Sequence, residues 1–116
     1  MACRNPHRCD SAAARIRADF PTADVTPMKI DTSNLKTVRR FAVECSRVLG
    51  KRPLDMLFLN AGIGSAGFDE EGNFAMSEDN IEMVFATNHV GHHLLYNLLE
   101  PALQATLTLT VTLTLT

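Results

Sequence analysis

Three glycines near the middle of the chain have the spacing of a loop that holds phosphate. Gly62, Gly64 and Gly67 lie in the stretch LFLNAGIGSAGFDEEG, which spans residues 57–72. In a G-x-G-x-x-G loop the glycines let the backbone approach a dinucleotide pyrophosphate, which rests on the N-terminus of the helix that the third glycine opens. In a suitable context this spacing would mark the start of a cofactor-binding domain.

The residues after these glycines argue against that interpretation. Gly67 is followed by an acidic run at residues 69–71, whose charges would repel a pyrophosphate, and then by a Gly-Asn pair that opposes helix formation. The acidic residue that binds the ribose, expected about 20 residues further on, would fall near Thr87 inside a predicted helix. We therefore interpret Gly64 and Gly67 as loop glycines, and the informative signal as the Asn-Ala-Gly triplet at residues 60–62.

Three histidines close together are the other candidates for site chemistry. His89, His92 and His93 stand at positions i, i+3 and i+4 of a predicted helix, so two of them could chelate a metal from one helix face. No cysteine or carboxylate stands at a matching spacing. We therefore predict no metal site.

Strands and helices alternate in the elements that must position these residues. Helices are expected at residues 11–20, at residues 35–49 with Gly50 at the end, and from Ser77 onward, with Gly91 as a bend. Asp31, Thr32 and Ser33 are candidate caps of the second helix. Residues 2–3 are expected to be the last residues of a strand, and further strands are expected at residues 25–30 and 54–59. Pro27 places the strand at residues 25–30 at a sheet edge. The strand at residues 54–59 is almost entirely apolar, which is typical of a strand buried on both faces. The pattern predicts an α/β fold with a doubly wound parallel sheet.

The composition is that of an ordinary globular chain. The 116 residues are 46% hydrophobic and 21% charged, and a net charge of −2 gives no reason to expect nucleic acid or an anionic membrane as a partner. No apolar run approaches the roughly 20 residues that span a bilayer, so we expect no membrane segment and, by default, a cytoplasmic location. Cys3, Cys9 and Cys45 are odd in number and lack C-x-x-C spacing, which favours reduced thiols.

The C-terminal residues differ from this pattern. From Thr106 onward, threonine alternates with leucine or valine. A period of two is compatible with a strand that has one apolar face, whereas a central parallel strand would be apolar on both faces. We treat residues 105–116 as a low-complexity tail and an association hazard.

Four short segments, in order and in spacing, resemble the short-chain dehydrogenase/reductase family. Residues 2–5 resemble the end of the family's second strand, and Ile30-Asp31 before a Leu-x-x-Val-x-x-Phe helix resembles the end of the third. Residues 57–62 resemble the fourth strand, and residues 85–92 the fourth helix. The similarity is greatest to the retinol dehydrogenase and WW-domain oxidoreductase branch. It implies that residues 1–104 form a partial NAD(P)-binding, Rossmann-like domain, which lacks the family's first strand and its C-terminal half.

The resemblance also suggests roles for residues at the strand ends. Arg4 occupies the position whose basic residue pairs with the 2′-phosphate of NADP, for which a guanidinium is well shaped; alternatively it is a solvated arginine in a turn. Asp31 resembles the acid that accepts a hydrogen bond from the adenine, and it could also cap a helix.

Two further positions are implied to contact or support the cofactor. Asn60, Ala61 and Gly62 would bring the backbone close to the cofactor's ribose, where small residues are needed; otherwise they form a simple strand-ending turn. Asn88 resembles the helix asparagine that helps to hold a water in the family's proton relay. The alternative for Asn88 is a polar side chain on an exposed helix face.

The residues of hydride chemistry are not found in this sequence. The family reaction uses a Tyr-x-x-x-Lys pair and a serine, yet the only tyrosine, Tyr96, is followed four residues later by Glu100, and no lysine follows Lys51. The family's glycine-rich turn would lie before Met1. We therefore expect an internal fragment of an NADP- or NAD-dependent oxidoreductase acting on an alcohol or carbonyl, retinoid-, steroid- or lipid-like, and inactive alone.

The alternative is a non-catalytic interaction protein. It would form a homodimer through the fourth-helix region, Ser77 to Leu103. Because the first strand would separate the other strands in the family's sheet, we expect this chain alone to be partly molten or associated.

Overall fold

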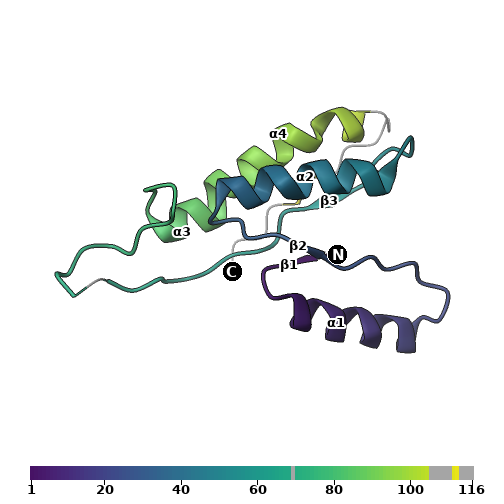
Figure 1. The fold of residues 1–116 in the computed structure, drawn as a ribbon, viewed down its shortest axis with the longest axis horizontal. Helices are drawn as coiled ribbons and strands as arrows, with labels where there is room; N and C mark the ends of the chain where they lie inside the picture. Colours follow the sequence, from purple (N-terminus) through teal and green to yellow (C-terminus); the bar gives the residue numbers. More distant parts are fainter. Residues whose placement is uncertain (69, 105–110, 113–116) are drawn as a thin grey trace. The chain divides into compact units, whose positions relative to one another are not determined.

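A computed structural model describes residues 1–68 and 70–104, and the backbone of residues 111–112 (Figure 1). The chain divides into two compact units, residues 1–31 and residues 32–116. Parallel strand pairs and helices occur in both, which confirms the α/β class. Within the described residues, no helix is both long and apolar enough to cross a bilayer.

The first unit is a strand, a helix and a second strand. β1 (Ala2–Cys3) pairs in parallel with β2 (Met28–Lys29), and α1 (Pro6–Asp19) connects them. The helix begins earlier than the sequence indicated, because Asn5 caps it by accepting a hydrogen bond from the Arg8 amide at 3.2 Å and a proline occupies its first turn. Cys9 and Ala13 form its buried face.

The expectation of three reduced thiols is wrong for this unit. Cys3 and Cys9 form a disulfide, with their Cα atoms 5.6 Å apart. The short turn between β1 and α1 brings the two residues into bonding range, a proximity that spacing in the sequence does not reveal. Cys45 is a free, half-buried thiol on the second helix, and burial raises its pKa.

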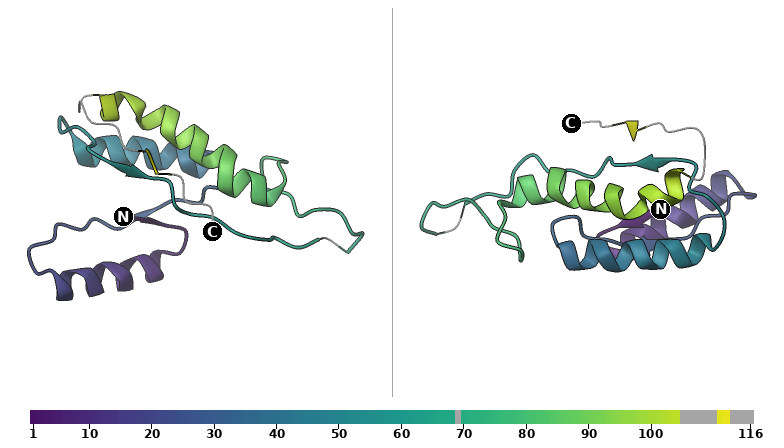
Figure 2. Two further views of the ribbon diagram at one scale, coloured as in Figure 1. Left: turned by 180° about the vertical axis from the view of Figure 1, so that it is seen from behind. Right: turned by 90° about the horizontal axis from the view of Figure 1, so that it is seen from above.

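The second unit is built on two packed helices. α2 (Leu35–Leu49) and α4 (Gly91–Gln104) lie side by side in every view (Figures 1 and 2). The predicted end of α2 is confirmed, since Gly50 ends it with a φ of 63°, but the helix begins after Asn34 and not directly after residues 31–33. Between the helices lie the apolar side chains of the core: Val38, Phe41, Ala42, Leu95, Leu99 and Leu103 are all buried.

The strands of the second unit are shorter than predicted. β3 (Leu57–Phe58) pairs in parallel with β4 (Val111–Thr112), Leu57 opposite Val111. The Leu54 amide donates instead to the carbonyl of Ala102 at 3.0 Å, which removes it from any ladder. In the first unit, Pro27 has no amide hydrogen, and β2 begins only after it. Apart from β4, the tail beyond residue 104 lies outside the described residues.

The prediction that residues 54–59 are buried on both faces is also wrong. Leu59 is buried, but Met56 is 58% exposed and Phe58 is 70% exposed. Alternate side chains of a strand point to opposite faces, so one face of this strand is open in the described structure. The apolar run therefore correctly indicated a strand, but it wrongly indicated that both faces of this strand are buried.

The last helical region begins later than expected and is irregular. α3 (Met83–Phe85) is followed by the π-helical turn η1 (Ala86–Val90) and then by α4. Glu82 is the N-cap, since its carboxylate accepts hydrogen bonds from the amides of Val84 at 2.9 Å and Phe85 at 2.7 Å. Residues 77–82 form turns instead of a helix, and Asn80 has a φ of 56°.

Candidate functional site

Asn88 lies in the π-helical turn and holds the segment that follows β3. Its Oδ1 accepts a hydrogen bond from the Ile63 amide at 2.8 Å, and its Nδ2 donates one to the Ile63 carbonyl at 2.9 Å. Both backbone groups of one residue are therefore bound by a side chain 25 positions away. This two-bond clamp excludes the alternative of an Asn88 side chain on an exposed helix face.

The Asn88 side chain leaves little room for a residue larger than glycine at position 62. A Cβ atom added at Gly62 would lie 3.2 Å from the Asn88 Oδ1. A larger residue would push against the amide that makes both bonds to Ile63. The structure thus gives a packing reason for this glycine, in addition to the cofactor contact that the resemblance implies. Asn60, Ala61 and Gly62 are all exposed, so this strand end is open to a ligand.

The π-helical turn is stabilised by side chains of the helix itself. The Thr87 hydroxyl donates to the Met83 carbonyl at 2.7 Å, and the His92 Nδ1 lies 3.2 Å from the Asn88 carbonyl, so it is the protonated ring nitrogen of this bond. Single π-helical turns are rare and often occur at functional sites. Burial lowers the pKa of His92; the bond to Asn88 acts in the opposite direction, and His89 lowers it further. His92 is therefore a neutral, buried donor near pH 7.

Gly91 follows the π-helical turn directly and is explained by a close contact. A Cβ atom at Gly91 would collide with the carbonyl of Thr32, the residue that begins the second unit. Only glycine lets the backbone of α4 approach the segment leading into α2 so closely. Sequence reasoning did not detect this contact, because it joins residues 59 positions apart in the numbering.

The N-terminus of α2 is held by groups that the sequence did not single out. Asn34, and not Asp31, is its N-cap: the Asn34 Oδ1 accepts from the Thr37 amide at 3.1 Å. Asp79 accepts a hydrogen bond from the Leu35 amide at 2.8 Å, and Glu78 accepts one from the Asn34 Nδ2 at 2.7 Å. Carboxylates are favourable at a helix N-terminus, so this pair fixes the turn at residues 77–82 to α2.

Arg4 and Asp31 are brought together at one end of the first unit. Cys3 pairs with Lys29, and the Ile30 amide donates to the Cys3 carbonyl at 3.0 Å. Arg4 and Asp31 therefore follow neighbouring parallel strands at their carboxyl ends, where open α/β sheets bind ligands. Arg4 is exposed and Asp31 is half buried. The six predicted site residues thus form two groups, Arg4 with Asp31 and residues 60–62 with Asn88.

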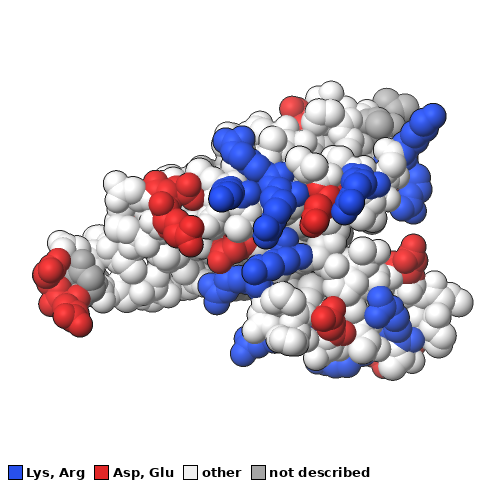
Figure 3. All heavy atoms as spheres, viewed as in Figure 1, with Lys and Arg blue, Asp and Glu red and all other residues white. Residues whose placement is uncertain are grey.

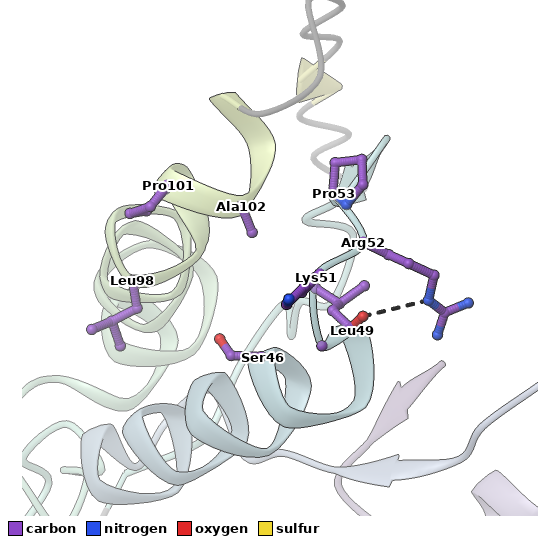
Figure 4. A pocket seen from close by; sticks show the side chains of 9 residues that line it. Ser46, Leu49, Lys51, Arg52, Pro53, Leu98, Pro101 and Ala102 are labelled. Atoms are coloured by element: carbon purple, nitrogen blue, oxygen red, sulfur yellow. Dashed lines mark hydrogen bonds between the residues drawn. The ribbon is translucent and has the colours of Figure 1, made fainter.

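A cavity of about 450 Å³ in the second unit has none of the predicted site residues in its lining (Figure 4). It is bounded by residues 49–53 at the end of α2 and by Leu98, Pro101 and Ala102 on α4. The Arg52 side chain turns away from it and binds the carbonyls of Leu49 and Val48. A smaller cavity of about 300 Å³ adjoins the segment after Ile63 and is lined by residues 64–68, Phe74, Glu82 and Val84.

The histidines lie on two sides of the helix. His89 and His93 are exposed and their rings stack, with centroids 6.2 Å apart, whereas His92 is buried. Among the residues that the structure describes, no group of three or more histidines, cysteines or carboxylates is placed to hold a metal ion.

Comparisons with known proteins agree with the sequence resemblance. The chain is 36% identical to the chloroplastic short-chain dehydrogenase TIC 32 B of Brassica napus and 34% identical to retinol dehydrogenase 13 of Homo sapiens, over 99 residues in each case. The structure resembles the solved RhlG/NADP active-site complex of Pseudomonas aeruginosa, with a TM-score of 0.68 and 26% identity, over 92% of this chain and 38% of that chain. No protein-family model matches the chain.

The alignments with the two curated relatives extend over most of this chain but over a small part of theirs. Each covers 85% of the chain, and the chain spans about 28% of the relative's length. These relatives and their neighbours are members of the family that the sequence predicted, so that prediction is confirmed. The chain belongs to the short-chain dehydrogenase/reductase family, in the branch of the retinol dehydrogenases and WW domain-containing oxidoreductases.

Proposed function

We propose that this chain provides the adenosine side of the NAD(P) site of a short-chain oxidoreductase. The observation that carries the proposal is the exposed strand end at residues 60–62, which the two hydrogen bonds of Asn88 hold in place. A preorganised backbone with small side chains suits the close approach of a ribose. Two of the solved structures that this chain resembles are described as complexes with NADP, which supports the same cofactor class.

Arg4 and Asp31 would recognise the adenosine half of the cofactor. Arg4 is exposed at a strand end, where its guanidinium can bind a 2′-phosphate through two parallel hydrogen bonds. Asp31 can accept a hydrogen bond from the adenine amino group. These roles favour NADP over NAD, because only NADP carries the phosphate that Arg4 would neutralise.

The role of Asn88 is that of a positioning residue. Its side chain makes two hydrogen bonds to Ile63, so we propose that it acts on the cofactor through the backbone that it holds. The family reaction is hydride transfer between the nicotinamide and an alcohol or carbonyl, and we propose a retinoid-, steroid- or lipid-like substrate for the oxidoreductase.

We further propose that this chain alone does not catalyse the reaction. Tyr96 is half buried on α4 and has Glu100, not lysine, one helical turn further on. The lysine that the family reaction uses beside its tyrosine is therefore not present at this position. Cofactor binding without turnover is the expected behaviour.

A fluorescence titration tests the cofactor proposal. NADPH should bind the chain with a change in nicotinamide fluorescence, and Arg4→Ala should weaken NADPH binding about tenfold while leaving NADH binding unchanged. Arg15→Ala, at another exposed arginine of the first unit, is the matched control. Equal effects of the two substitutions, or no NADPH binding by the parent chain, would overturn the proposal.

Self-association through the fourth-helix region is a second candidate function. Phe85 is 54% exposed and its ring stacks on His89, with centroids 5.1 Å apart. An exposed aromatic stripe on a helix is suited to contact with a second copy. Phe85→Ser should then reduce a dimer that persists at high salt, measured by sedimentation; an unchanged dimer would reject this role.

A further inference from the structure

The charges of the chain are separated along its sequence. All 11 lysines and arginines lie in residues 1–52, and residues 53–116 contain eight of the 13 acidic residues. The overall charge of −2 hides this division. Within the second unit, basic side chains gather along α2, with the carboxylate of Glu44 among them, and further carboxylates lie beyond β3 (Figure 3).

The basic stripe of α2 consists of Lys36, Arg39, Arg40, Val43 and Arg47. Residues 36, 40, 43 and 47 recur at helical spacing on one face, and Arg39 flanks them. All five side chains are exposed, and Val43 is 71% exposed at the centre. Arg47 forms an ion pair with Glu44, with the two charged groups 4.0 Å apart. The stripe is thus a row of positive charge around an apolar centre.

The acidic arm consists of residues 64–68 and 70–76. Phe68 and Phe74 form an antiparallel bridge, their rings lie 5.1 Å apart, and they are 66% and 62% exposed. Glu70 and Glu71 lie between them at the turn. Figure 1 shows this segment extending past α3 within the second unit, and Figure 3 shows a group of carboxylates there. The arm presents negative charge beside an apolar aromatic pair.

We propose that the acidic arm of one copy docks on the basic stripe of a second copy. The two surfaces match in both respects: carboxylates meet guanidinium groups, and the exposed phenylalanine pair meets Val43. The stripe is not covered by the arm of its own copy, since all five of its side chains are exposed. Complementary charge around an apolar centre is the usual arrangement of a specific interface.

Each copy offers one arm and one stripe, so two copies can exchange arms in a closed two-fold dimer, or each copy can bind the next in an open chain. The arm has fewer residues than the roughly 20–30 that each partner contributes to a stable interface, so we expect weak binding on the order of 100 µM. The proposal is independent of the cofactor site, which includes no residue of the arm or the stripe.

Sedimentation velocity at two salt concentrations tests the charge dependence. The sedimentation coefficient should rise with protein concentration at about 25 mM salt and stay constant at about 500 mM, where the exposed charges are screened. Association through the aromatic stripe of the fourth helix would instead persist at high salt. Salt-independent association would therefore overturn the arm–stripe contact.

A charge-reversal experiment identifies the two surfaces. Arg40→Glu/Arg47→Glu reverses the stripe and Glu70→Lys/Glu71→Lys reverses the arm, so each variant alone should remain monomeric. Their equimolar mixture should associate, because each variant supplies the surface complementary to the other. Arg8→Glu/Arg15→Glu, on exposed positions of α1, makes the same charge change elsewhere and should leave association unaltered. A mixture of folded variants that stays monomeric would contradict the proposal.

Neutral variants keep the test valid if a reversed variant does not fold. Arg40→Gln and Glu70→Gln remove one charge each and conserve the side-chain length. Each should weaken association about threefold to tenfold, with folding monitored by circular dichroism. No change in either variant would overturn the arm–stripe contact.

Discussion

The two units of the chain present their candidate residues in different ways. In the first, Arg4 and Asp31 follow two strands that pair directly, and a disulfide between Cys3 and Cys9 closes the connecting turn. In the second, residues 60–62 are held by a side chain 25 positions beyond Ile63. The first site depends on neighbouring elements, whereas the second depends on contacts between distant segments.

This difference has consequences for stability and for function. A perturbation of the distant contacts should loosen the second unit and leave the first intact. Reduction of the disulfide should do the reverse. Amide hydrogen exchange, measured separately for residues 1–31 and for residues 32–104, distinguishes the two units because local opening reports on each segment.

The largest effect is expected from Gly91→Ala. Its methyl group would collide with the Thr32 carbonyl, and a backbone neighbour cannot move aside cheaply. We expect a loss of about 3 kcal/mol or more in the unfolding free energy of the second unit. Gly64→Ala is the matched control, since a Cβ atom there meets nothing within 4 Å. Equal exchange rates in the two variants would show that the Gly91 contact is unimportant.

Asn88→Ala should have the next largest effect. It leaves the amide and the carbonyl of Ile63 without their partner, which costs about 2 kcal/mol. The comparison is with Asn97→Ala, which removes a single exposed bond to the His93 carbonyl and should cost less than about 0.5 kcal/mol. Chemical denaturation followed by circular dichroism measures both. Similar losses would mean that the clamp is not specific.

Reduction of the Cys3–Cys9 disulfide should affect only the first unit. The bond closes a loop with a sequence separation of 6, for which the chain-entropy model gives about 2 kcal/mol. Dithiothreitol should therefore speed exchange in α1 and leave α4 unchanged. Faster exchange in α4 would show that the units are not independent.

The smallest effect is a pH dependence from His92. Its pKa is lowered by burial from the ordinary 6.5, so both states are neutral well above that pH and stability is unaffected there. As the pH falls through 6.5, the unfolded state takes up a proton that the folded state resists, and stability declines. His92→Gln should flatten this decline between pH 7.5 and 5.5 in guanidinium unfolding. An equal slope in the variant would assign the pH dependence to another group.

Local patterns predicted the fold where local interactions determine it. The end of α2 is correct because its apolar spacing and Gly50 act within the helix itself, whereas its cap is Asn34 and not one of residues 31–33. The helix expected at residues 11–20 begins earlier, at Pro6, because the Asn5 side chain caps it. The strands are shorter than their apolar runs, since a ladder also needs a partner with free donors and acceptors.

The candidate sites were predictable to different degrees for the same reason. Arg4 and Asp31 follow strands, and parallel pairing brings them to one edge without further information. The hydrogen bonds of Asn88 to Ile63 were not predictable, because residues 25 positions apart meet only through the π-helical turn. An asparagine with poor helix propensity was the signal in the sequence, but it did not reveal its partner.

Amide hydrogen exchange with and without NADPH tests the central claim most directly. We predict that NADPH slows exchange at the strand ends, in residues 3–5, 30–32 and 60–63, and leaves the end of α2 and the C-terminal part of α4 unchanged. Slowing confined to residues 49–53 and 98–102, around the larger cavity, would contradict the account. Unchanged exchange throughout the chain at saturating NADPH would contradict it equally.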